Sequence, residues 1–327
     1  MKLVSKVLLA GACAGLSQFA PAQTAPASYP NKPIRVVAPS SAGGPVDVIT
    51  RVLAQGMTET LGQQVVVDNR AGAAGLIGAE LVAKSPPDGY TLLLGFSGPL
   101  AIVPNLNDNT PYDPLKDFAP VTLAASAPYV LLVHPSVPAR SVKELVALAK
   151  SRAGKLNYAS GGNGTGIHMA GELFKLTAGV RIVHVPYKGA GPGMAALMAG
   201  EVDMMFNGLS PALPYIKSGR LRALAVGGEQ RSPLVPDLPT ISESGYQFHT
   251  TGWYGVLAPR GTPQAIIAKL HGEIVRALNV PAVKDQLTKL AVEAIGSTPE
   301  QFSVLMREEF VKWAKVIKAA DLKGMQP

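Results

Sequence analysis

Short apolar runs alternate with amphipathic stretches along the chain from residue 34 onward. The pattern predicts strands at 34–39, 64–69 and 90–96 and helices at 46–61 and 76–85. The longer helix is indicated by apolar residues that recur on one face, namely Ile49, Val52, Leu53, Met57 and Leu61. Pro45 suits the first position of this helix, where a missing N–H costs nothing.

The same order recurs in the second half of the chain. Strands are predicted at 156–160, 181–187 and 202–208, with helices at 167–179 and 194–201. Apolar strands that alternate with helices are typical of parallel sheets covered by helices on both faces. Two such blocks predict two α/β lobes, each a mostly parallel sheet flanked by helices, and not a single barrel.

Two strands are predicted to connect these lobes. The run at 128–135 gives the first crossing, and a return crossing lies between the runs 221–226 and 253–259. Two crossings would act as a hinge, because each lobe could then rotate about the pair.

The end of the chain is predicted to be helical at 264–278 and 299–320, with a capping box at 297–300. If these helices pack on the first lobe, that lobe is discontinuous. The predicted boundaries are then 30–126 plus 251–327 for the first lobe and 127–250 for the second.

Four glycine-rich loops, at 40–45, 70–75, 160–166 and 188–193, all follow a predicted strand and precede a helix. In open α/β sheets, ligands bind beyond the carboxyl ends of strands, where helix N-termini offer unpaired N–H groups to anions. A single such loop is explained as well by a positive φ or by close packing. Four in equivalent places favour an anion site. Four to six hydrogen bonds to a charged group give on the order of 6–18 kcal/mol gross, against about 8 for micromolar binding.

Several side chains near these loops have two interpretations each. Asp47 is either a favourable first-turn carboxylate or a group that holds the glycine loop by hydrogen bonds. Arg70 is expected to tie down its loop and Lys188 to face solvent, with ligand contact as the alternative for both. His168 is a candidate for supporting the loop from behind, and Asp203 is expected to be a strand-end residue.

The sequence lacks the motifs of several common activities. It has no G-x-G-x-x-G dinucleotide fingerprint, no phosphate loop and no H-E-x-x-H, so no cofactor and no metal site are predicted. The segment 95–99 misses the nucleophile elbow by one position. A hydrolase using Ser97 or Ser160 is the enzymatic alternative, disfavoured because no His–Asp set is expected nearby. No enzyme is predicted.

The N-terminus has the pattern of an export signal. Lys2 and Lys6 precede an apolar stretch at 7–16, and an A-x-A site predicts cleavage after Ala22, so residues 1–22 form the signal peptide. A buried N-terminal helix is one alternative, and a lipoprotein anchor at Cys13, the only cysteine, is another. The predicted location is the periplasm.

Net charge is +8, from 30 basic and 22 acidic residues, and the basic residues are dispersed along the chain. Nucleic-acid binding would require a clustered basic stripe, so no such partner is predicted. A mildly positive surface instead raises the local concentration of small anions.

Several segments carry a resemblance to a known family. They are YPNKPIRVVAPSSAGGPVDVITR (29–51), LGQQVVVDNRAGAAGLIGAELVAKSPPDGYTLLLG (61–95), LNYASGGNGTGIHMAGELF (156–174), VHVPYKGAGPGMAALMAGEVDMMF (183–206), LPTISESGY (238–246) and WYGVLAPRGTP (253–263). The chain resembles the Bug family, the extracytoplasmic solute receptors of tripartite tricarboxylate transporters. The resemblance implies a two-lobed type II periplasmic-binding-protein fold with a two-strand hinge.

The resemblance also implies a small carboxylate ligand, gripped by main-chain N–H groups of both lobes. The implied contacts are Ser41, Ala42, Gly43 and Gly44 in the first lobe, and Ser160, Gly161, Gly164, Thr165, Tyr187 and Lys188 in the second. Ser40, Asp47, Ser97, His168 and Asp203 complete the candidate set. Ser40 stands where the family usually has an aromatic residue, so the particular acid is not implied. The chain is expected to be a monomer. The implied partners are membrane permease subunits of the TctA and TctB type, or a sensor protein.

Overall fold

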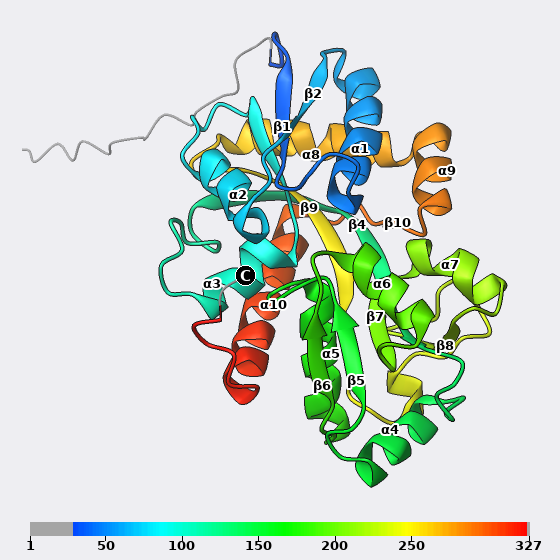
Figure 1. Cartoon of the computed structure of the whole chain (residues 1–327). Coiled ribbons are helices and arrows are strands. Elements are labelled where there is room, and N and C mark those ends of the chain that lie inside the picture. The colour runs from blue at the N-terminus through cyan, green and yellow to red at the C-terminus, as the bar shows by residue number, and fades with distance from the viewer. Residues whose placement is uncertain (1–28, 326–327) are drawn as a thin grey trace, which may run out of the picture.

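The computed structural model describes residues 29–325 and shows two lobes that meet along one connected set of strands (Figure 1). The predicted signal peptide, its cleavage site and Cys13 lie outside the described residues. The strand order is β2-β1-β3-β9-β4-β7-β5-β6, and β8 and β10 also pair with β4. The prediction of a two-lobed α/β fold is confirmed.

The first lobe contains a parallel sheet that an antiparallel strand extends. β1 (Ile34–Ala38) lies between β2 (Val65–Asn69) and β3 (Thr91–Gly95), and β9 (Thr251–Pro259) pairs with β3 in the antiparallel sense. Its first helices are α1 (Pro45–Leu61) and α2 (Leu76–Ala83). α1 begins at Pro45, as its spacing and proline predict, and ends before Gly62, which has a φ of 64°.

The second lobe repeats this arrangement. β5 (Asn157–Ser160) runs parallel to both β6 (Val183–Pro186) and β7 (Met204–Gly208), while β7 and β8 (Arg222–Val226) run antiparallel to β4. The helices of this lobe are α4 (Val142–Ser151), α5 (Gly166–Ala178), α6 (Ala190–Ala199) and α7 (Leu209–Lys217).

One long strand, β4 (Phe118–Val133), belongs to both lobes. Its first part pairs with β9 and its last part, from Tyr129, pairs with β7. The predicted crossing at 128–135 is therefore the second half of a longer strand. The chain returns where the Gly227 N–H donates to the Tyr129 carbonyl (2.8 Å) and the Thr250 N–H donates to the Gly227 carbonyl (2.9 Å), just before β9.

The C-terminal helix α10 (Pro299–Ala319) packs against both lobes (Figure 1). Phe302 near its start joins an apolar cluster with Leu93 and Leu257 of the first lobe, whereas Trp313 joins a cluster with Phe174 of α5. The exact lobe boundaries, 30–126 plus 251–327 and 127–250, stay a prediction.

The predicted capping box at 297–300 is wrong by one residue. The box is formed by Thr298 and Gln301, because each side chain bonds the backbone N–H of the other. Ser297 instead accepts a hydrogen bond from the Leu123 N–H (3.0 Å).

The remaining elements are α3 (Val103–Leu106), α8 (Gln264–Leu278), α9 (Pro281–Lys289), β10 (Glu293–Ala294) and three short helices, η1 (Ala73–Gly75), η2 (Gly98–Ile102) and η3 (Ser242–Ser244). α8 spans the residues predicted for it. Within residues 29–325, no helix is both long and apolar enough to cross a membrane.

Candidate functional site

The predicted anion loops lie at the carboxyl ends of strands. Residues 39–44 connect β1 to α1, and residues 161–165 connect β5 to α5. In Figure 1, the N-terminal end of α1 is turned toward the lower lobe, and those of α5 and α6 are turned toward the upper lobe. Each helix start carries a positive partial charge that favours an anion.

In the first-lobe loop, Ser41, Ala42 and Gly43 are exposed. Gly43 has a φ of +78°, which favours glycine, and its N–H donates to Asp47 Oδ2 (2.8 Å). The Gly44 N–H donates to the Ser41 carbonyl (3.3 Å). The N–H groups of Ser41 and Ala42 donate no hydrogen bond to another described residue, so they are the free donors of this loop.

The Asp47 carboxylate holds this loop in place and is only 2% exposed. Besides the Gly43 N–H, it accepts from Asn69 Nδ2 (2.9 Å) and Arg51 Nε (3.1 Å). Burial alone would raise the pKa of Asp47, but these hydrogen bonds and the Arg51 charge hold the pKa below its usual value. Of the two roles predicted for Asp47, the structure shows the one in which its carboxylate orders the loop by hydrogen bonds. The negative charge of Asp47 is balanced by Arg51.

In the second-lobe loop, several predicted donors are used within the loop itself. Gly164, with a φ of +71°, donates its N–H to His168 Nδ1 (3.2 Å). The Thr165 hydroxyl donates to the Gly162 carbonyl (2.8 Å) and caps α5 by accepting from the His168 N–H (3.3 Å). Across the described chain, the N–H groups of Gly161 and Gly166 have no such partner.

The predicted donor set therefore needs correction at two positions. Gly43 and Gly164 direct their N–H groups inward to side chains of the following helix. They are needed for the shape of the loops, while the outward donors are those of neighbouring residues. A loop glycine whose N–H bonds the side chain four residues ahead has no sequence pattern of its own. The sequence therefore does not tell which N–H groups of a loop point inward and which point outward.

Two hydroxyl groups, one from β4 and one from the segment that follows β3, reach the start of α5. A methyl carbon placed on Gly166 would lie 2.3 Å from the Tyr129 hydroxyl and 3.6 Å from Ser97 Oγ. Ser97 follows β3 of the first lobe, so the two lobes approach each other closely here. Neither hydroxyl makes a hydrogen bond to any described residue, which leaves both available to a ligand. Ser97 is among the residues predicted for the site from the sequence, whereas Tyr129 is not.

A second tyrosine lies beside the same junction. A methyl carbon on Gly252 would lie 3.5 Å from the Tyr129 hydroxyl and 3.6 Å from the Tyr254 hydroxyl. Burial raises the pKa of Tyr254 to about 12 and that of Tyr129 further, so both phenols stay protonated and each has an O–H that can donate a hydrogen bond. Tyr129 and Tyr254 belong to the strands β4 and β9, which lie at the crossings between the lobes. Their place in crossing strands is the feature of the sequence from which a role in the site could have been predicted.

Beneath the second-lobe loop lies a buried group of aromatic and histidine rings. Ser160 Oγ is 2.7 Å from His184 Nε2, and the His184 ring stacks on that of His168 at a centroid distance of 4.0 Å. Burial, His168 and Lys175 lower the pKa of His184 to about 3, although Glu172 opposes them. Burial and Lys175 lower the pKa of His168 to about 4.

His184 lies beside Ser160, one of the two serines named for the enzymatic alternative. However, Ser160 is fully buried, and its hydroxyl also accepts from the Gly162 N–H (3.1 Å). No Asp or Glu within residues 29–325 bonds to His184, and the Glu172 carboxylate is taken by the Tyr158 hydroxyl (2.6 Å) and Lys175. The pair lacks the orienting carboxylate and the access to substrate of a hydrolytic triad.

Some predicted residues do not join the others. Asp203 pairs with Asn157 at the start of β5 (2.8 Å), which is the end of the strand opposite to the loop. This position favours the strand-end interpretation of Asp203 over a contact with the ligand. Lys188 is exposed, and Arg70 bonds both Asp68 oxygens at 3.0 Å, as expected for a residue that ties down its loop.

The predicted residues Ser40 and Tyr187 lie beside the loops. The Ser40 N–H donates to the Ala38 carbonyl (2.8 Å), and Asn69 Nδ2 donates to the Ser40 carbonyl (3.2 Å). The Tyr187 N–H donates to the Ser160 carbonyl (3.2 Å). No cluster of three His, Cys, Asp or Glu that could hold a metal occurs in the described part of the chain.

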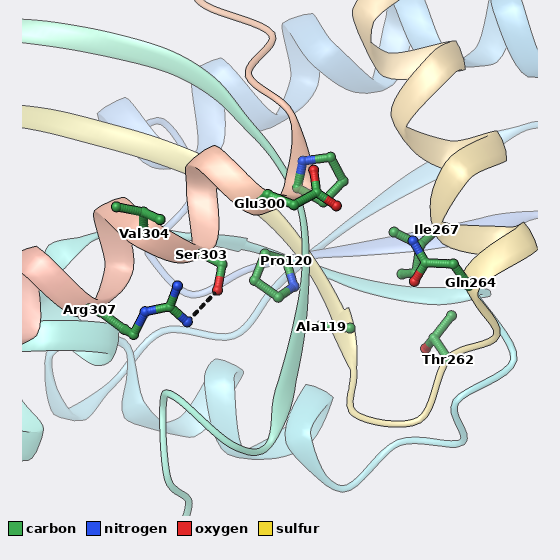
Figure 2. Close-up of a pocket in the computed structure, with 10 residues that line it drawn as sticks. Ala119, Pro120, Thr262, Gln264, Ile267, Glu300, Ser303, Val304 and Arg307 are labelled. Atoms are coloured by element: carbon green, nitrogen blue, oxygen red, sulfur yellow. Dashed lines mark hydrogen bonds between the residues drawn. The ribbon is translucent and has the colours of Figure 1, made fainter.

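A separate hollow of about 350 Å³ lies away from these loops (Figure 2). It is bounded by the start of β4 and by the first turns of α8 and α10, and it includes Pro120, Gln264 and Glu300. Arg307 in its wall bonds Ser303 (3.0 Å). None of the residues predicted for the site lines this hollow.

A two-lobed α/β fold with helix N-termini at the junction of its lobes is typical of periplasmic solute-binding proteins. The family model described as "Tripartite tricarboxylate transporter family receptor" matches residues 49–322. The chain belongs to this family.

Relatives and solved structures agree with that assignment. The chain is 40% identical to "UPF0065 protein in tcbD-tcbE intergenic region" of Pseudomonas sp. (strain P51), over 91% of this chain and 89% of the relative. It is 39% identical to "Protein BugT" of Bordetella pertussis, over 90% and 91%.

Two similar solved structures have titles that name small acids. "R. palustris Rpa4515 with adipate" is 36% identical, with a TM-score of 0.79 over 90% of this chain and 99% of that one. "MatC (Rpa3494) from Rhodopseudomonas palustris with bound malate" is 34% identical, with a TM-score of 0.76 over 88% and 100%.

Proposed function

We propose that this receptor is an exported, non-catalytic protein that binds a small organic carboxylate between its two lobes. The single observation that supports this most is the set of free donors in the loop before α1 and at the start of α5, one set from each lobe. Ser41 and Ala42 offer N–H groups in the first lobe, and Gly161 and Gly166 do so in the second. The relatives whose titles name adipate and malate support a dicarboxylate as the first ligand class to test.

The hydroxyls of Ser97 and Tyr129 add neutral donors to this set. A carboxylate accepts hydrogen bonds from N–H and O–H groups without requiring a lysine or arginine, and charge-assisted bonds of this kind contribute about 1.5–3 kcal/mol each. Donors from both lobes would let one ligand stabilise the state in which the lobes are together.

Delivery to permease subunits of a tripartite transporter is the proposed role, with delivery to a sensor protein as the alternative. Both roles require a periplasmic location, which we propose from the signal pattern at 1–22. N-terminal sequencing of the exported protein should then begin at Gln23. A protein that begins elsewhere, or stays in the cytoplasm, would contradict the export proposal.

The experiment is a thermal-shift screen of mono-, di- and tricarboxylates, followed by calorimetric titration of each compound that stabilises the protein. A ligand at 100 times its Kd adds about 2.7 kcal/mol to the free energy of unfolding. Ser97→Ala should weaken binding of that ligand, whereas Ser136→Ala, at an exposed position beside His134, should not. A protein that binds none of these acids, or converts one of them to product, would refute the proposal.

A further inference from the structure

The two candidate loops share an internal hydrogen bond of the same form. In each, a glycine with a positive φ donates its N–H to a side chain four residues ahead, in the first turn of the following helix. Gly43 donates to Asp47 (2.8 Å) and Gly164 donates to His168 (3.2 Å). Both acceptor residues are buried, at 2% and 0% exposed. We call this bond the latch of the loop.

We propose that His168 is a positioning residue for ligand binding, which acts by latching Gly164 so that the N–H groups of Gly161 and Gly166 stay directed to the ligand. This inference rests on the proposed function, because it assumes that the loop binds the ligand. The histidine itself is fully buried and does not touch the ligand in this account.

The His168 ring has one hydrogen bond, and that bond is the latch. Its Nε2 finds no partner within the described part of the chain, and Glu172 Oε1 lies 3.9 Å away, beyond hydrogen-bond distance. In a neutral imidazole one nitrogen is a donor and the other an acceptor. Because Nδ1 accepts from Gly164, the proton is assigned to Nε2. A buried Nε2–H without a partner costs free energy of folding. The hydrogen bond that the other nitrogen, Nδ1, accepts from Gly164 therefore explains why a histidine stands at position 168.

Neighbouring rings fix the orientation of the latch. The His168 ring stacks at 4.0 Å from that of His184 and nearly parallel, at 11°, to the ring of Tyr158. His184 in turn bonds Ser160 Oγ, which accepts from the Gly162 N–H. The loop is thus held at two points, Gly162 and Gly164, by groups from three elements, β5, β6 and α5.

The two latches differ in charge. Asp47 is a carboxylate whose charge is matched by Arg51 at 3.0 Å, whereas His168 is neutral. The charged groups near His168 are Glu172 and Lys175, and they pair with each other at 2.7 Å. A neutral acceptor holds the second loop without placing an uncompensated negative charge behind an anionic ligand.

The expected change in Kd follows from the fraction of molecules in which the second-lobe loop is ordered. If the latch is lost and the binding-competent conformation falls to about a tenth, the apparent Kd rises about tenfold. Asparagine can place its amide oxygen near the position of Nδ1, while the longer glutamine places its amide near Nε2. His168→Asn should therefore keep the latch, and both His168→Gln and His168→Leu should lose it.

The test measures the affinity for adipate or malate by calorimetry in the wild type and the three variants. We expect a Kd about tenfold higher or more for His168→Leu and His168→Gln, and a Kd within about threefold of wild type for His168→Asn. His134→Leu, at a half-buried histidine whose ring bonds Ser136 and no glycine of the loops, is the control and should bind as the wild type does. Equal Kd values for His168→Asn and His168→Gln would overturn the inference.

A second measurement keeps the inference separate from the proposed function. Hydrogen exchange of the Gly164 amide in the free protein should be at least tenfold faster in His168→Gln than in wild type and His168→Asn. Unchanged exchange would overturn the latch even if ligand binding is normal. If the latch is present but the wild type binds no carboxylate, the proposed function fails and the positioning role fails with it. If His168→Leu does not fold, the comparison of Asn with Gln still decides.

Discussion

An added methyl group on Gly166, the first residue of α5, tests whether the nearby Tyr129 hydroxyl binds the ligand or serves only the packing of the protein. A methyl carbon there would lie 2.3 Å from the Tyr129 hydroxyl, whereas real contacts of this kind essentially never fall below 3.0 Å. The gap must therefore open by about 0.7 Å, the difference between these two values. The methyl would also face Ser97 Oγ at 3.6 Å, an ordinary contact.

The methyl should displace the Tyr129 hydroxyl more than it disturbs the fold. Alanine is favoured over glycine in helices by about 0.8–1 kcal/mol in the interior and by less at a helix start, which partly offsets the cost of overpacking. If Tyr129 donates to the ligand, displacing it removes a hydrogen bond to a charged group, about 1.5–3 kcal/mol. The Kd of Gly166→Ala should then rise by about 10- to 150-fold.

The assay is a double-mutant cycle by calorimetric titration with a ligand found for the wild type. Tyr129→Phe removes the hydroxyl and should cost a similar factor in affinity. Adding Gly166→Ala to Tyr129→Phe should cost little more, because the group that the methyl displaces is already absent. Gly272→Ala in α8 is the matched control, since its methyl meets no atom within 4 Å.

Two results would refute this reasoning. An unchanged Kd in Gly166→Ala would show that the Tyr129 hydroxyl does not serve the ligand. Fully additive losses in the double variant would show that Gly166 and Tyr129 act independently, and that the predicted contact does not limit binding.

Three further predictions concern stability. The buried Glu309 accepts from the indole N–H groups of Trp253 (3.1 Å) and Trp313 (2.8 Å). Glu309→Leu should therefore lower the free energy of unfolding, measured in urea melts, by about 2–5 kcal/mol, while Glu309→Gln should lower it much less. The pKa of His168 is about 4 when folded and about 6.5 when unfolded, so the unfolded chain binds more protons in this window. The His168 contribution to the free energy of unfolding should fall by up to about 3 kcal/mol as pH drops from 6.5 to 4; the total drop should be smaller in His168→Asn, where the lowered pKa of His184 still contributes. Thr298→Ala removes the cap of α10 and should cost about 1 kcal/mol, measured as a lower Tm; an unchanged Tm would contradict the role of the cap.

The parallel strands and six of the helices, α1, α2, α5, α6, α8 and α10, could be predicted from the sequence because their apolar spacing is regular, whereas α4, α7 and α9 were not predicted. α8 begins and ends where its pattern does, at Gln264 and Leu278. The first half of β4 could not be predicted, since FAPVTLAASA contains a proline and small residues and no clear alternation. Its strand conformation comes from pairing with β9, which lies more than a hundred residues away along the chain.

The loops of the site could be located from the sequence, but their hydrogen bonds could not. Glycine-rich junctions indicate where N–H groups are exposed, and they do not tell which N–H turns inward to Asp47 or His168. Ser160 and His184 are 24 residues apart and meet only because β5 and β6 are parallel and in a register that local spacing does not encode. Tyr129 was missed because its strand reads as a connection between lobes.

The most direct test of the central claim is a crystal structure of the protein with a bound dicarboxylate. We predict carboxylate oxygens within hydrogen-bond distance of the backbone N–H groups of Ser41 or Ala42 in one lobe and of Gly161 or Gly166 in the other. A ligand lodged in the hollow beside α8 and α10, or bound by one lobe through lysine or arginine side chains, would contradict it.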